Sequence, residues 1–194
     1  MVNERMLLVK LSTQELVLAA MFTALMCIVT MLVRIFQPIV VLPFSLQPFI
    51  MLLAACILSP RAASLSMLAY LGLGLIGMPV FSVPPCGGPA YILLPSFGFI
   101  LGFPLAAWVQ SKLIRKTNLL NFIIAGIVGV LIYYAIGLPY MYVILNFYLG
   151  QAINVMSLIK IGFLPFITFD LIKIAIASFL AVQLIMKLDL HREF

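Results

Sequence analysis

Residues 161–186 form a stretch long enough to cross a lipid bilayer, yet this stretch contains two charged residues, Asp170 and Lys173. A membrane-crossing helix needs roughly 20 apolar residues at about 1.5 Å per residue. Ionised side chains inside the hydrocarbon region are costly and usually mark a ligand, ion or proton site. A spacing of three residues places both side chains on one face of a helix. We therefore expect Asp170 and Lys173 to bind a small zwitterionic or polar anionic ligand.

The alternative for the same two residues is a buried ion pair that only ties helices together. Such pairs are weak support for stability, because the desolvation of the two charges can exceed their Coulomb attraction. The rarity of charge in membrane spans favours the ligand site.

The composition places the whole chain in a membrane. Of its 194 residues, 65% are hydrophobic and 8% are charged, so the chain has more apolar surface than a soluble domain of this size can bury. The first ten residues include Glu4, Arg5 and Lys10, and the apolar stretch that follows is too long for a signal-peptide core, so we expect no cleaved signal peptide. We treat residues 1–194 as a single transmembrane domain.

Proline, glycine and charged residues divide the chain into six apolar segments. They are residues 13–36, 46–58, 62–78, 92–111, 119–137 and 165–187. We predict an all-α integral membrane protein that folds as a compact bundle of six transmembrane helices. The second segment is short for a membrane span, and the third is only just long enough.

Basic residues predict the orientation, because cytoplasmic connections are enriched in Lys and Arg. Eight of the eleven Lys and Arg residues fall on one side of the predicted bundle: Arg5, Lys10, Arg61, Lys112, Arg115, Lys116, Lys187 and Arg192. We therefore predict a multi-pass protein of the cell membrane with both ends, about residues 1–12 and 188–194, in the cytoplasm. Orientation in the bilayer accounts for the basic excess, so we expect no nucleic-acid partner.

Three connections fall on the outer side, residues 37–45, 79–91 and 138–164, and all three are unusually apolar. The last has enough large apolar residues to pack against the bundle, so we predict a partly helical outer cap that acts as a lid. Asp170 lies five residues after Pro165, which would begin the last span. The charged pair is then roughly 7 to 8 Å below the outer end.

The connection before the fourth segment is rich in glycine and proline. Non-helical backbone at membrane depth is tolerated where it is buried in protein or lines a cavity. Gly87 and Gly88 allow the main chain to approach a ligand closely, and Phe81 and Tyr91 offer flat apolar walls. These residues predict the rim of a pocket. An ordinary tight turn, whose prolines stop the flanking helices, is the alternative.

Three further features point to a ligand or a partner. Gln47 offers a donor and an acceptor, so we predict that it contacts the ligand, with satisfaction of backbone groups freed by Pro48 as the alternative. Arg34 is expected to snorkel to the interface rather than to add positive potential at a pocket mouth. Ala20 and Ala24 form a small-xxx-small pair that allows close approach of a partner subunit or of another helix of the bundle.

The residue types argue against catalysis and metal binding. Cys27, Cys56 and Cys86 have no paired spacing and His191 is the only histidine, so we predict no disulfide framework, metal site or cofactor. Nucleophilic hydrolysis needs a general base, and an acid/base pair needs more than one carboxylate inside the spans, where Asp170 is the sole candidate for such a role. The phosphate-binding motif GxxxxGKS/T is absent from the sequence, so the chain does not hydrolyse nucleotide through that motif.

Four sequence motifs, in their order and spacing, resemble the biotin-specific BioY family, the substrate-binding S components of energy-coupling factor (ECF) vitamin transporters. They are Phe44-Ser-Leu-Gln-Pro48, Ile76-Gly-Met-Pro-Val-Phe81 with Gly87-Gly-Pro-Ala-Tyr91, Pro95-Ser-Phe-Gly-Phe-Ile-Leu-Gly-Phe103, and Leu164-Pro-Phe-Ile-Thr-Phe-Asp-Leu-Ile-Lys173. The resemblance extends over most of the chain. It implies a bundle of six helices that captures biotin from outside and works with a transmembrane coupling subunit and two ATPase subunits.

The resemblance also assigns roles to single residues. It implies that Asp170 and Lys173 match the family's Asp-x-x-Lys pair and contribute to biotin binding. It further implies that Ala20 and Ala24 match the AxxxA pattern that the family uses against the coupling subunit.

The chain departs from the family's usual pattern at three places. It has Pro95-Ser-Phe-Gly-Phe99 where Pro-Thr-Gly-Gly-Tyr is usual, Thr168-Phe169 where Pro-Gly is usual, and Val83-Pro-Pro85 where small residues are typical. These changes are expected to reshape the pocket. The resemblance as a whole makes biotin uptake the leading hypothesis. The alternatives are an S component for another vitamin, a solitary facilitator, or a small intramembrane enzyme that uses Asp170 as a base.

Overall fold

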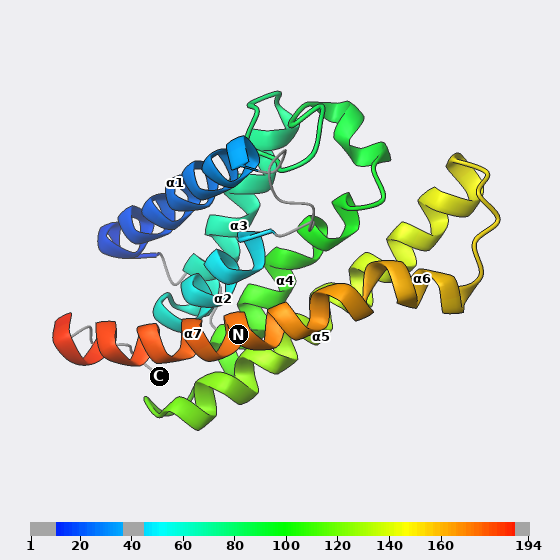
Figure 1. The fold of residues 1–194 in the computed structure, drawn as a ribbon. Coiled ribbons are helices and arrows are strands. Elements are labelled where there is room, and N and C mark those ends of the chain that lie inside the picture. The colour runs from blue at the N-terminus through cyan, green and yellow to red at the C-terminus, as the bar shows by residue number, and fades with distance from the viewer. Residues whose placement is uncertain (1–10, 37–44, 189–194) are drawn as a thin grey trace, which may run out of the picture.

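The computed structural model describes residues 11–36 and 45–188, and this part of the chain folds into helices without a β-strand (Figure 1). The α-helices are α1 (Thr13–Phe36), α2 (Gln47–Ile57), α3 (Pro60–Leu75), α4 (Phe97–Leu113), α5 (Leu119–Val143), α6 (Val155–Gly162) and α7 (Leu164–Leu188). A 3-10 helix, Pro89–Leu93, precedes α4, and a π-helical turn, Ile144–Tyr148, continues α5.

Several predictions fall on residues outside this described part. These residues are the two chain ends and most of the predicted first outer connection, and they include Glu4, Arg5, Lys10, Phe44, His191 and Arg192.

The predicted segments correspond to helices, but two of their bounds were wrong. The helix predicted over residues 92–111 is interrupted, because Leu94 is extended, with φ −88° and ψ 138°, as the residue before a proline tends to be. The fifth helix continues past Gly137 and Pro139 to Val143. Its added turns are packed, since the Tyr140 ring lies 5.9 Å from that of Phe97.

The helix count also differs from the prediction. The described residues contain seven α-helices, because the long connection before the last predicted span includes α6, and this connection is partly helical as expected. Three helical stretches of the described chain are long and apolar enough to cross a membrane: Thr13–Ile35, Leu119–Tyr148 and Leu164–Lys187. The helices α2 and α4 are apolar but shorter.

Side-chain caps fix where several helices begin. Ser12 and Glu15 form a capping box on α1, in which the Glu15 N–H donates to Ser12 Oγ (3.1 Å) and the Ser12 N–H donates to Glu15 Oε2 (2.9 Å). Ser59 caps α3 by accepting from the Ala62 N–H, and its hydroxyl donates to the Glu15 carboxylate. The start of α1 is thereby tied to the turn between α2 and α3.

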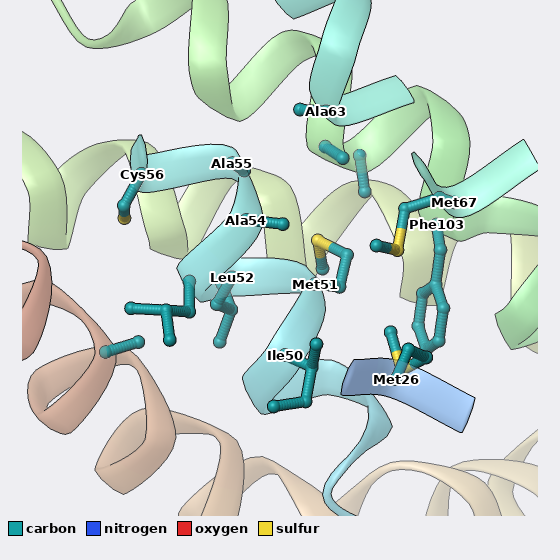
Figure 2. Close-up of a cluster of buried hydrophobic side chains, with 14 of the residues drawn as sticks. Met26, Ile50, Met51, Leu52, Ala54, Ala55, Cys56, Ala63, Met67 and Phe103 are labelled. Carbon is teal, nitrogen blue, oxygen red and sulfur yellow. The ribbon is translucent and has the colours of Figure 1, made fainter. Parts of the chain in front are cut away.

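The helix α2 lies at the centre of the bundle and is almost entirely buried (Figure 2). Its apolar side chains belong to one buried cluster with Met26 of α1, Met67 of α3 and Phe103 of α4. A helix that is apolar all round is typical of a protein core. Packing on every side explains how a helix of 11 residues is maintained here.

The helices α4 and α5 pack closely because glycines face large side chains. A Cβ atom on Gly102 would lie 2.9 Å from Tyr133 Cα, and one on Gly137 would lie 2.4 Å from Phe99 Cδ1. Small residues at such contacts let helix backbones approach each other. This close packing brings Phe99 and Tyr133 side by side (ring centroids 6.5 Å apart).

Several exposed basic residues lie near one end of the bundle. Ser111 Oγ donates to the Leu58 oxygen (2.7 Å), so the ends of α4 and α2 lie together, near the start of α1. The basic residues Arg61, Lys112, Arg115 and Lys116 are exposed in these parts of the chain. Figure 1 shows the C-terminal end of α7 and the start of α1 on the left and α6 on the right.

Candidate substrate-binding site

A cavity of about 370 Å³ lies between α2, α4, α5 and α7, towards the end of the bundle that carries α6. Its walls are mostly apolar and aromatic, with side chains such as Phe99, Phe103, Met141 and Phe166. Sites for small molecules are typically apolar cavities of about 300–1,000 Å³ with a few placed polar groups. The few polar groups of this cavity therefore determine which ligand groups it can bind.

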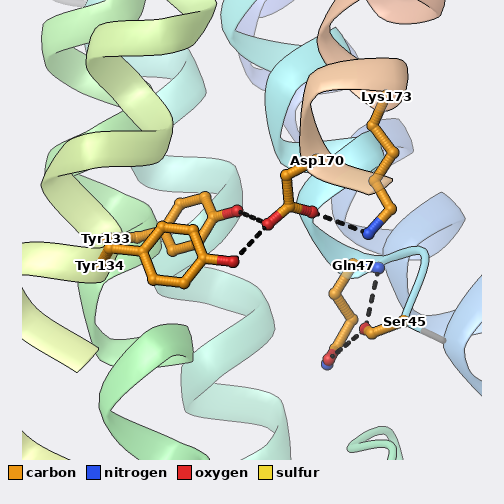
Figure 3. Close-up of polar contacts among 6 residues, drawn as sticks. All are labelled: Ser45, Gln47, Tyr133, Tyr134, Asp170 and Lys173. Carbon is orange, nitrogen blue, oxygen red and sulfur yellow. Dashed lines mark hydrogen bonds and ion pairs between the residues drawn. The ribbon is translucent and has the colours of Figure 1, made fainter. Parts of the chain in front are cut away.

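Asp170 and Lys173 line the cavity together (Figure 3). The two side chains are buried, with residue exposures of 2% and 7%. Lys173 Nζ donates to Asp170 Oδ1 at 2.8 Å. The pair is thus both a buried ion pair and part of a cavity wall, so neither interpretation of the sequence excludes the other.

Two tyrosines that the sequence analysis missed complete the charged cluster. The hydroxyls of Tyr133 and Tyr134 donate to Asp170 Oδ2, at 2.6 and 2.8 Å, and both residues line the cavity. Their signal in the sequence was the presence of two phenols within an apolar span, since a buried tyrosine hydroxyl usually needs a partner. Figure 3 shows both rings reaching from α5 towards Asp170 on α7.

A second polar cluster surrounds Gln47, which also lines the cavity. Gln47 Nε2 donates to the Tyr70 hydroxyl, and that hydroxyl donates to the Val80 oxygen (2.8 Å). Gln47 Oε1 accepts from Ser45 Oγ (3.0 Å) and Ser82 Oγ (3.4 Å). Gln47 therefore connects the start of α2 to α3 and to the loop that follows it.

Tyr91 brings a further hydroxyl to the cavity wall. The residue is fully buried, and its phenol oxygen makes no hydrogen bond within the described part of the protein. Its ring packs on Phe81, with centroids 4.3 Å apart. A buried hydroxyl without a partner is costly, so a ligand in the cavity has a donor available there.

Three other predicted site residues do not line the cavity. Phe81 is fully buried, and the absence of a Cβ on Gly74 leaves room for its ring. A Cβ on Gly87 would lie 2.2 Å from the Met78 oxygen. Gly88 has φ +89° and donates its N–H to the Gly74 oxygen at 2.7 Å. The two glycines fold the loop back onto the end of α3.

Arg34 stabilises the same loop. We expected it to snorkel to the interface, but its guanidinium donates to the main-chain oxygens of Pro79 (3.0 Å) and Phe81 (3.3 Å). The next residue along this loop, Ser82, lines the cavity. Arg34 thus connects the C-terminal end of α1 to one wall of the cavity.

Ala20 and Ala24 are exposed on α1. Ala19 and Thr23 instead face the interior, where Thr23 Oγ1 donates to the Ser66 oxygen on α3 at 3.0 Å. Within the part of the chain that the structure describes, the small-xxx-small pair is therefore exposed and not part of the buried core. It remains open to a partner or to lipid.

A family model described as the BioY family matches residues 3–189. The chain belongs to the BioY family. A probable biotin transporter BioY of Lysinibacillus sphaericus is 40% identical over 179 residues, which cover 91% of this chain and 88% of that one. The biotin transporter BioY of Thermotoga maritima is 34% identical over 180 residues, which cover 92% of this chain and 99% of that one.

One solved structure has a similar fold. It is described as the S-component for biotin from an ECF-type ABC transporter, and it superposes with a TM-score of 0.69 at 23% identity, covering 90% of this chain and 94% of that one. BioY is a family of transporters rather than of enzymes. Together with its apolar helices, this membership makes the chain a multi-pass membrane protein.

Proposed function

We propose that this BioY chain is a biotin-binding S component, which captures biotin from outside the cell and delivers it inward with an ATP-driven coupling complex. The observation that carries the proposal is the buried Asp170–Lys173 pair on the wall of an apolar cavity of about 370 Å³. Neither charge faces lipid alone, and a space of ligand size lies beside them.

The chemistry of the cavity suits biotin. Biotin has two ureido N–H donors, a carbonyl oxygen, an apolar ring and chain, and a carboxylate. Asp170 accepts from an N–H, and Lys173 pairs with a ligand oxygen. The ring and chain lie against side chains such as Phe99 and Phe166, and the Tyr91 hydroxyl is available to a second polar group.

The remaining parts of the proposal concern the membrane and partners. Residues 1–194 are one transmembrane domain whose six predicted apolar segments cross the membrane, with both termini in the cytoplasm and the α6 connection as an outer lid. Ala20 and Ala24 form the docking face for a transmembrane coupling subunit, and two ATPase subunits supply the energy. The exposure of both alanines supports that role.

Binding of labelled biotin to the purified protein tests the site. We expect Asp170→Asn and Lys173→Ala each to weaken binding at least about tenfold, because each breaks the buried ion pair on the cavity wall. Lys187→Ala is the matched control, since Lys187 is exposed on the same helix, α7. Unchanged affinity in both site variants would remove the assignment.

Competition tests the identity of the vitamin. Three residues that depart from the family pattern, Val83, Ser96 and Phe99, line the cavity, so the ligand must be established separately from the family. Displacement of labelled biotin by unlabelled biotin, but not by riboflavin, thiamine or pantothenate, supports the proposal. Uptake into vesicles that lack the ATPases would instead indicate a solitary facilitator.

A further inference from the structure

The two tyrosines beside Asp170 are held in an arrangement that a helix does not give by itself. Adjacent residues on an α-helix point roughly 100° apart, yet the hydroxyls of Tyr133 and Tyr134 meet at one carboxylate oxygen. Their rings lie 4.9 Å apart at 31°. Edge-to-face contacts support each ring, from Phe103 to Tyr133 (5.5 Å) and from Phe163 to Tyr134 (4.9 Å).

These contacts divide the two oxygens of Asp170 between different partners. An ionised carboxylate offers about two acceptor positions on each oxygen. Oδ2 accepts from both phenols and is therefore filled, whereas Oδ1 accepts from Lys173. Within residues 11–36 and 45–188, Oδ1 thus keeps an acceptor position for a donor in the cavity.

The orientation of this carboxylate depends on the phenols. The terminal torsion of an aspartate side chain has a broad distribution of values, so the carboxylate does not select one orientation by its own rotamer preference. Lys173 lies on the same helix as Asp170 and contacts Oδ1, not Oδ2. Two donors on a neighbouring helix fix Oδ2, and so fix the direction of Oδ1.

We propose that Tyr133 and Tyr134 are positioning residues that orient Asp170 so that Oδ1 receives an N–H of the ligand. This inference rests on the proposed binding of biotin. The phenols act through Asp170, and their effect on the ligand requires that carboxylate.

The carboxylate can be observed directly, because the chain contains two aspartates, Asp170 and Asp189. Protein labelled with 4-¹³C-aspartate gives two side-chain carboxyl signals by NMR, and Asp189→Asn assigns them. We expect Tyr133→Phe and Tyr134→Phe each to shift the Asp170 signal. Tyr148→Phe is the matched control, since Tyr148 is 57% exposed near the end of α5, and it leaves the signal in place. An unshifted Asp170 signal in both variants overturns the proposal.

Binding of labelled biotin supplies the second measurement. Each of the two variants should bind biotin about tenfold more weakly, the effect of losing one hydrogen bond to a charged group. In the Asp170→Asn background the same changes should cost less than about twofold, because coupled residues are not additive. An affinity equal to that of the unmodified protein, or an equal loss in both backgrounds, contradicts the positioning role.

The outcomes separate this inference from the proposed function. If the unmodified protein does not bind biotin, the proposed function fails, and the NMR measurement still tests the orientation of Asp170. If one variant does not fold, the other carries the test, since both phenols donate to the same oxygen.

Discussion

Removal of Lys173 separates a ligand site from a purely structural ion pair. In Lys173→Ala, Asp170 stays buried and loses the ammonium group 2.8 Å from its Oδ1. Breaking a buried pair by removing one partner costs about 3–5 kcal/mol. Tyr133 and Tyr134 still donate to Oδ2, so we expect the lower part of that range.

The expected loss of unfolding free energy can be expressed as a change in melting temperature. For a chain of about 150–250 residues, 1 kcal/mol shifts the midpoint of thermal unfolding by about 2–4 °C. A loss of about 3 kcal/mol then lowers the midpoint of the ligand-free protein by roughly 6–12 °C. Lys187→Ala, an exposed lysine on the same helix, should change it by less than about 2 °C.

A double variant completes the experiment. Asp170→Asn with Lys173→Met removes both charges, and we expect it to recover most of the lost stability, because replacing both partners of a buried pair is often neutral. Biotin binding should remain lost. The assay is thermal unfolding in detergent, followed by binding of labelled biotin to the same samples. Recovery of binding in the double variant would show that the pair is not part of the ligand site and would refute the assignment.

Two further changes test the walls of the cavity. Arg34→Met removes the donors that hold the loop beside the cavity, so bound biotin should dissociate severalfold faster in a chase with unlabelled biotin. Arg61→Met is the exposed control. Equal dissociation rates in the two variants would contradict the role of Arg34. Gly137→Ala places a Cβ 2.4 Å from Phe99 Cδ1 and should push that ring into the cavity, weakening equilibrium biotin binding by about tenfold. Gly72→Ala is its control, since no heavy atom lies within 4 Å of the added Cβ, and equal affinities in the two variants would show that Phe99 does not shape the site.

Helical spacing made part of the site predictable. Asp170 and Lys173 are three residues apart in an apolar helix, so local geometry alone put them on one face, and their side chains are paired in the structure. The break before α4 was also readable in principle, because Pro95 restrains Leu94. Gln47 has a polar amide at the start of an apolar helix, which indicated a ligand contact, and the structure places this residue on the cavity wall.

Other parts of the site depend on tertiary packing that the sequence pattern does not contain. Tyr133 and Tyr134 are adjacent residues, and only the packing of α4 and α7 against α5 brings both hydroxyls within hydrogen-bonding distance of Asp170. Phe81 lies in the same loop as Tyr91 and has a similar ring. Because Gly74 leaves space for it, Phe81 packs into the core, while Tyr91 lines the cavity.

The most direct test of the site is an experimental structure of the purified protein bound to biotin. We expect biotin in the cavity between α2, α4, α5 and α7, with a polar atom within hydrogen-bonding distance, about 2.7–3.2 Å, of the Asp170 carboxylate or the Lys173 ammonium. Biotin bound elsewhere on the chain, with Asp170 and Lys173 contacting only each other and the two tyrosines, would contradict the account.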